Sequence, residues 1–142
     1  MKTYDALSIA EKISSALLVT FGLLSISRGA FWILKSEDAI DDSPLYAALH
    51  NVMPLWYWGL MFVLFGMGLC LASFFIPRRL VNLKFEIFLV IGGLGSSAFY
   101  FFLTVVAISD SLNWLTPLQF LIQTVGLGVI GVIGVISYAR KC

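Results

Sequence analysis

The sequence predicts an all-α integral membrane protein, a four-transmembrane-helix bundle with a short amphipathic outer-surface helix between the first two spans. Two observations lead to this prediction. The chain of 142 residues is 60% hydrophobic and only 12% charged, whereas soluble domains are about 45–50% apolar and about 25% charged. Its apolar residues also fall into four blocks, and a helix needs about 20 such residues to cross the hydrocarbon core. We therefore expect residues 1–142 to form a single membrane domain.

The four blocks set the positions of the expected spanning helices. At a rise of about 1.5 Å per residue, each block covers roughly 33 Å, which is enough to span a bilayer with modest tilt. Helices suit these blocks because every backbone polar group then finds its partner inside the segment. The expected spans are residues 13–34, 55–76, 87–108 and 117–138.

The connection after the first block predicts a short helix at about residues 44–53. Pro44 suits the first turn of a helix, because its missing N–H would have no partner there. Leu45, Leu49 and Met53 then recur every four residues, which places them on one face. We expect this amphipathic helix to lie on the outer membrane surface or over the mouth of the bundle.

The basic residues are distributed unequally between the two faces of the predicted bundle. Lys35 is alone on one face, where the acidic residues also gather. Lys and Arg in short loops accumulate on the cytoplasmic side of a membrane, so both termini are expected to be cytoplasmic. The basic residues assigned to this inner face are Lys2, Lys12, Arg78, Arg79, Lys84, Arg140 and Lys141.

Arg28 is the formal charge that falls inside a predicted span, about 7 Å outward of the midpoint of its helix at the same rise per residue. A charge at this depth is costly unless it is paired or faces water. We expect a structural clamp, in which Arg28 contacts an outward acid or a helix-end carbonyl. The alternative is that Arg28 lines a polar cavity or pore. The residues expected to share this polar cluster with it are Gln119, Gln123, Asp110, Asp41 and Asp42.

Glycines and other small residues recur in all four blocks and predict how the helices meet. Lipid supplies no hydrophobic drive for helix association, so close backbone approach matters more than in water. Each helix therefore offers a packing face, which suits a compact bundle and could equally support homo-oligomers. The glycines expected at helix contacts are Gly22, Gly29, Gly66, Gly92, Gly95, Gly128, Gly131 and Gly134.

The sequence contains no pattern typical of a metal, cofactor or catalytic site. His50 is the only histidine, and Cys70 and Cys142 stand far apart. The stretch from Gly126 to Gly131 matches a dinucleotide-binding pattern, but that fingerprint needs a strand before it. The net charge of +1 gives no basic patch for nucleic acid. We expect no enzymatic activity, no cofactor, no metal and no nucleic-acid partner.

In size and number of spans the chain resembles small multidrug transporters. That family depends on a membrane-embedded glutamate in the first helix, whereas this chain carries Arg28 there. The outline is also similar to small accessory membrane proteins of bacterial and phage genomes, including holins, which implies the bacterial cytoplasmic membrane. We expect a non-enzymatic interaction or regulatory component, an accessory protein that contacts the lipid bilayer and another membrane protein or copies of itself. The alternatives are a self-associating holin-like pore with Arg28 near its outer mouth, and a small transporter.

Overall fold

The computed structural model describes residues 7–142, and it confirms the predicted fold class. The chain is helical, and four of its helices are long and apolar enough to cross a membrane. This protein is therefore a four-span helical membrane protein. The long helices are α1 (Ile9–Leu34), α4 (Leu55–Phe75), α5 (Lys84–Asp110) and α6 (Leu115–Lys141).

Two short helices, α2 (Ser36–Asp42) and α3 (Pro44–Val52), connect α1 to α4. The helix α3 was expected from the spacing of its leucines, and Leu45 and Leu49 are both buried. The helix α2 was not expected, because the sequence before Pro44 is acidic and short. Its first turn carries acidic residues, which favour the positive end of a helix, and its Ala39 is fully buried.

Three of the long helices extend beyond the apolar blocks that predicted them. The helix α1 begins at Ile9, α5 begins at Lys84 and α6 continues to Lys141. Hydropathy marks where the chain enters lipid, whereas the backbone hydrogen bonds continue into the polar flanks. A 3₁₀ turn, η2 (Ile76–Arg78), likewise extends α4. These extensions bring charged residues into the helical part of the fold.

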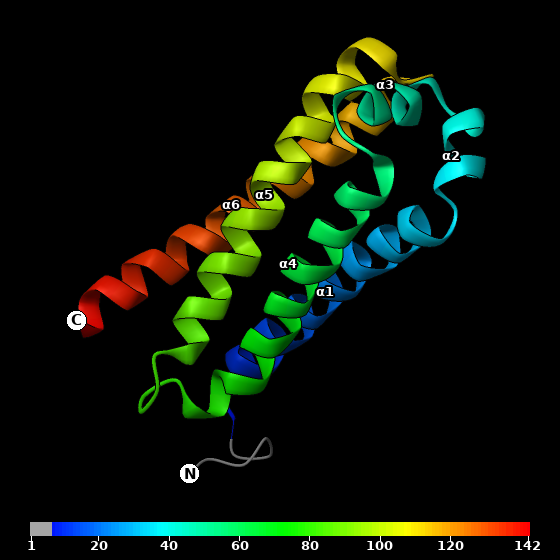
Figure 1. Ribbon diagram of the computed structural model, residues 1–142. Coiled ribbons are helices and arrows are strands. Elements are labelled where there is room, and N and C mark those ends of the chain that lie inside the picture. The colour runs from blue at the N-terminus through cyan, green and yellow to red at the C-terminus, as the bar shows by residue number, and fades with distance from the viewer. Residues whose placement is uncertain (1–6) are drawn as a thin grey trace.

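The long helices alternate in direction, so the molecule has two distinct ends (Figure 1). One end holds the start of α1, the η2 turn, the start of α5 and the end of α6, and we call it the basic end. The opposite end holds α2, α3 and the α5–α6 turn, and we call it the capped end. The basic residues assigned from the sequence to an inner face lie at the basic end, except Lys2, which lies outside the described residues.

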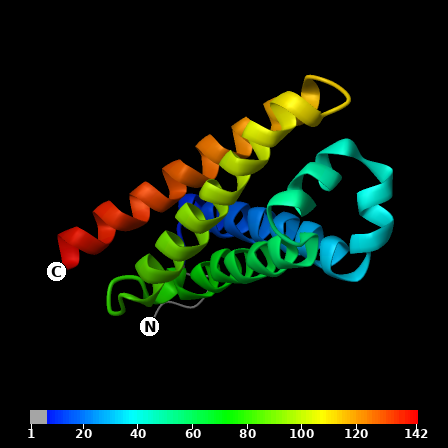
Figure 2. The same ribbon diagram turned by 45° about the horizontal axis from the view of Figure 1, so that its top comes forward.

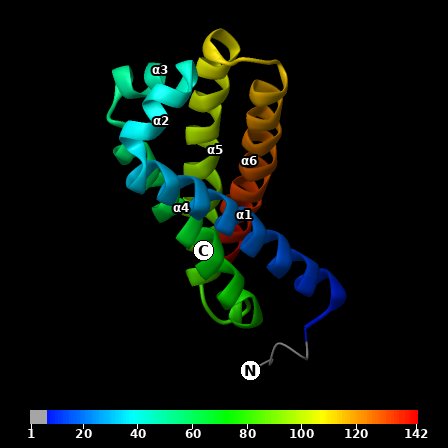
Figure 3. The ribbon, with the colours of Figure 1, turned by 90° about the vertical axis from the view of Figure 1, so that its right-hand side faces the viewer.

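The helices pack in chain order rather than as a closed ring. The helix α1 packs along α4, α4 packs on α5, and α5 packs along α6. Figure 2 shows the two antiparallel pairs, and Figure 3 shows α1 crossing the other helices obliquely. The helices α1 and α6 do not pack extensively against each other. The bundle is therefore open along the side where α1 and α6 face each other.

Glycines allow α1 and α4 to approach at two levels. A Cβ atom on Gly22 would lie 2.7 Å from the carbonyl oxygen of Gly66, and one on Gly66 would lie 2.7 Å from the carbonyl oxygen of Gly22. A Cβ atom on Gly59 would lie 2.6 Å from the carbonyl oxygen of Gly29. Helix contacts also surround the other glycines selected from the sequence, which are Gly92, Gly95, Gly128, Gly131 and Gly134.

Aromatic residues attach α3 to the capped end. The indole N–H of Trp58 donates to the carbonyl oxygens of Leu49, at 3.3 Å, and Met53, at 3.2 Å. Trp32 meets Tyr46 and Phe62 edge to face, with ring centroids 5.7 and 5.5 Å apart. Edge-to-face pairs add to the stability gained from burial alone. The helix α3 is therefore a lid packed on the bundle rather than a separate surface helix.

Candidate functional site

The open side of the bundle contains a cavity of about 460 Å³ at the basic end. We call it the lateral groove. Its walls come from α1 and α6, and its floor comes from α5, so it exists because α1 and α6 do not close on each other. Apolar side chains dominate its length, and ionic groups gather at its end. Its principal lining residues are Ala10, Glu11, Ser14, Leu17, Leu18, Ile76, Arg79, Phe85, Glu86, Leu89, Ile130, Ile133, Ser137 and Lys141.

The first ionic pair of the groove joins the start of α1 to the residue after η2. Arg79 Nη2 lies 3.0 Å from Glu11 Oε1, with side chains that are 48% and 10% exposed. Glu11 is held in place by a capping box, in which the Ser8 backbone N–H donates to Glu11 Oε2 at 2.7 Å. The capping box fixes the first turn of α1, and so it also fixes the carboxylate that faces Arg79.

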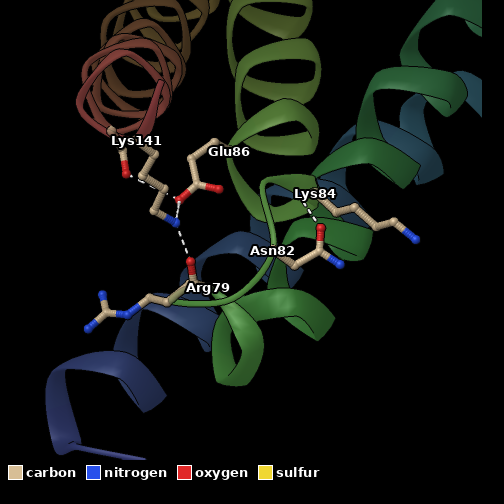
Figure 4. A network of polar contacts seen from close by, with 6 residues as sticks. Arg79, Asn82, Lys84, Glu86 and Lys141 are labelled. Carbon is tan, nitrogen blue, oxygen red and sulfur yellow. Dashed lines mark hydrogen bonds and ion pairs between the residues drawn. The ribbon is translucent and has the colours of Figure 1, made fainter.

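The second ionic pair joins α5 to the end of α6. Lys141 Nζ donates to Glu86 Oε1 and to the backbone carbonyl of Arg79 (Figure 4). Ser137 Oγ donates to the same Glu86 oxygen at 3.2 Å. The Glu86 side chain is only 1% exposed, whereas that of Lys141 is 29% exposed. The lysine thus bridges α6, α5 and the α4–α5 connection.

The two pairs together form a compact ionic cluster, Glu11, Arg79, Glu86 and Lys141. The two acidic and two basic side chains have no net formal charge, but one polar atom of the cluster has no hydrogen-bond partner. Glu86 Oε2 has no hydrogen-bond partner among residues 7–142, and nearly half of the Arg79 side chain is exposed. Because Glu86 Oε2 is buried, the exposed Arg79 guanidinium is the group that can meet a further polar group at the end of the lateral groove.

The contacts of the Arg28 side chain differ from those expected from the sequence. The predicted clamp is wrong, because within the described range 7–142 Arg28 forms neither an ion pair nor a side-chain hydrogen bond to a carbonyl, and the ion pairs there are Lys35–Asp38 and the two pairs of the ionic cluster. Its guanidinium carbon lies 4.8 Å from the ring centroid of Phe120 and 5.5 Å from that of Tyr100. Aromatic faces attract a guanidinium, so rings replace the expected carboxylate.

The other residues of the expected polar cluster are only partly brought together. Gln119 lines a pocket of about 270 Å³ at the capped end together with Arg28. Gln123 is not part of that lining. Asp41 and Asp42 are exposed at the end of α2, and Asp110 is half-buried at the end of α5, outside the pocket. The capped end therefore contains a polar pocket, but the acidic residues of the capped end do not line that pocket.

The ionic cluster was missed from the sequence, although one signal was present. Ser8 and Glu11 stand three residues apart before an apolar run, which is the pattern of a capping box. That pattern would have extended α1 to include Glu11. Glu86 and Lys141 carry no comparable signal, because they lie in the polar flanks of two blocks.

His50 has a structural role. Its Nδ1 accepts a hydrogen bond from the backbone N–H of Leu55 at 3.3 Å, which fixes the turn between α3 and α4. Within residues 7–142 there is no group of His, Cys, Asp and Glu side chains arranged to hold a metal ion. The groups that the ionic cluster offers for polar binding are carboxylate, ammonium, guanidinium and hydroxyl groups.

Comparison with known proteins gave no match among family models, curated proteins or solved structures. The class of four-span helical membrane proteins thus rests on the sequence and the fold.

Proposed function

We propose that this protein is a non-enzymatic accessory component of the membrane that holds one phospholipid in the lateral groove. The observation that carries the proposal is the position of the ionic cluster at the end of an apolar groove that is open between α1 and α6. An acyl chain would lie against Leu17, Leu89 and Ile133. The lipid phosphate would meet Arg79 and Lys141.

The size and chemistry of the groove support a small amphiphile as its occupant. Sites for small molecules are mostly apolar clefts of about 300–1,000 Å³ with a few placed polar groups, and the groove measures about 460 Å³. Basic pockets between transmembrane helices on the cytoplasmic side bind lipid headgroups. In the proposed orientation the basic end faces the cytoplasm, because Lys and Arg accumulate on that side.

A pore through a single chain has less support. Between the two ends, the interior contains Phe62, Leu69, Tyr100 and Leu127, which are all buried. Such side chains exclude water from the bundle axis. A holin-like pore would therefore have to form between several copies, and a transporter would have to open this packed interior.

Filling the groove with an indole ring tests the proposal. Ser14 lines the groove and is exposed, whereas Ala16 is exposed on the same helix outside the lining. We expect wild-type protein and the Ala16→Trp variant to retain one phospholipid per chain in native mass spectrometry from mild detergent. We expect Ser14→Trp to lose most of this lipid, because the ring occupies its space.

The comparison of the two tryptophan variants decides the outcome. Both add the same apolar side chain to α1, so a general effect on detergent binding would appear in both. Equal lipid retention by Ser14→Trp and Ala16→Trp would contradict the proposal, as would wild-type protein that carries no lipid under the same conditions.

A further inference from the structure

The pocket at the capped end has a different chemistry from the lateral groove. It measures about 270 Å³ and lies between α1, α3 and the start of α6. Arg28 carries the only formal charge in its lining, and Ser43, Asn113, Thr116 and Gln119 supply most of its polar groups. The pocket thus places one cation among neutral polar side chains.

The guanidinium of Arg28 is fixed by its surroundings and keeps its hydrogen-bond donors. Its contacts are the faces of Phe120 and Tyr100, which are 5% and 1% exposed. Ring faces hold the plane of a guanidinium by stacking and cation–π attraction. They leave its N–H groups available, and no carboxylate among the described residues takes them.

The neighbouring polar groups also have donors to spare. The Asn113 side-chain oxygen accepts from the backbone N–H groups of Leu115, at 3.2 Å, and Thr116, at 3.3 Å, so its amide nitrogen is left to donate. The Gln119 amide and the Ser43 hydroxyl make no hydrogen bond in the described part of the chain. A pocket with one cation and several unused donors matches an oxyanion.

We propose that this pocket binds a phosphoryl group, with Arg28 as its principal ligand and Gln119 as a second donor. Arg presents paired N–H groups that match two oxygens of a phosphate. The acids of the capped end, including Asp41, Asp42 and Asp110, lie outside the lining and disfavour large polyanions. The phosphoryl group would come from a lipid headgroup of the leaflet at the capped end or from free phosphate.

Titration of the purified protein in an uncharged maltoside detergent tests this site, with Arg79→Ala present in every protein titrated so that binding in the lateral groove is weakened. The two probes are inorganic phosphate and dihexanoyl phosphatidylglycerol, with heat of binding as the readout. We expect Arg28→Gln to weaken binding about 10- to 100-fold, because hydrogen bonds to charged groups are lost. Arg28→Lys keeps the charge without the paired geometry, and its affinity is expected to fall between those of wild type and Arg28→Gln. Lys35→Gln removes an exposed cation of the same end and is expected to leave binding unchanged.

The two probes identify the source of the phosphoryl group. Tighter binding of the lipid than of inorganic phosphate, with the same dependence on Arg28, would assign the site to a headgroup, and comparable binding would assign it to free phosphate. Gln119→Ala provides a second test of the site. Gln119 is exposed on α6, so this substitution is expected to leave the fold intact even if the Arg28 variants are unstable. The proposal is overturned if neither probe binds, or if Arg28→Gln and Gln119→Ala both bind like wild type.

Discussion

Replacement of Gly29 by alanine is expected to lower the free energy of unfolding by about 2–3 kcal/mol, at the upper end of what overpacking of a tight interior costs. The added Cβ atom would lie 2.9 Å from the backbone nitrogen of Val63 and still closer to the carbonyl oxygen of Gly59. Both obstacles are backbone atoms of α4, so a side-chain rotation does not relieve them. The helices must separate, and the contacts along their interface weaken.

The matched control for this change is Gly126→Ala in α6. No atom lies within 4 Å of a Cβ built on Gly126, so the methyl group meets no obstacle. Alanine is a better helix former than glycine by about 1 kcal/mol, and we expect unchanged or slightly increased stability. Thermal unfolding in detergent, followed by tryptophan fluorescence, measures both variants. Equal midpoints for Gly29→Ala and Gly126→Ala would contradict the close α1–α4 packing.

Removal of the Lys141 ammonium is expected to destabilise the basic end strongly. Breaking one partner of a buried ion pair costs about 3–5 kcal/mol, because the other charge stays buried. Glu86 is 1% exposed, whereas Lys141 is 29% exposed, so we expect Lys141→Met to cost about 3 kcal/mol, at the lower end of this range. Arg140→Met removes the same charge from the preceding residue, which is exposed, and is expected to change stability little.

A double-mutant cycle assigns this loss to the pair. Glu86→Gln removes the buried charge while its amide oxygen still accepts from Ser137. We therefore expect Lys141→Met to cost much less in the Glu86→Gln background than in wild type, as measured by the same thermal unfolding. An undiminished cost in that background would show that Lys141 acts through something other than Glu86.

Features that depend on sequence periodicity were predictable. The four spans follow from apolar blocks of sufficient length, and α3 follows from leucines at a spacing of four after a proline. The glycines of α1 and α4 were found because small residues at helical spacing have one common use in a membrane. In each case a local pattern maps directly onto a local structure.

Features that depend on which helix faces meet were not predictable. The long helices are apolar on nearly every side, so their sequences do not say that α1 and α6 stay apart. The lateral groove is a consequence of that separation. Glu86 and Lys141 lie far apart in the sequence and meet only because α5 and α6 are antiparallel. The aromatic partners of Arg28 were missed because Tyr100 and Phe120 lie on other helices and their spacing does not mark them as contacts of a guanidinium.

The most direct test of the proposed lipid-holding function compares two adjacent arginines. Arg79 lines the groove and pairs with Glu11, whereas Arg78 is exposed and lies outside the lining. Both variants, Arg79→Ala and Arg78→Ala, lose one positive charge at the same end of the molecule. The measurement is the dissociation constant of a phospholipid, obtained by titrating lipid into delipidated protein and counting bound molecules by native mass spectrometry. We expect about tenfold weaker binding for Arg79→Ala, equivalent to about 1.4 kcal/mol, and unchanged binding for Arg78→Ala. Equal affinities for the two variants would contradict a headgroup site at the end of the lateral groove.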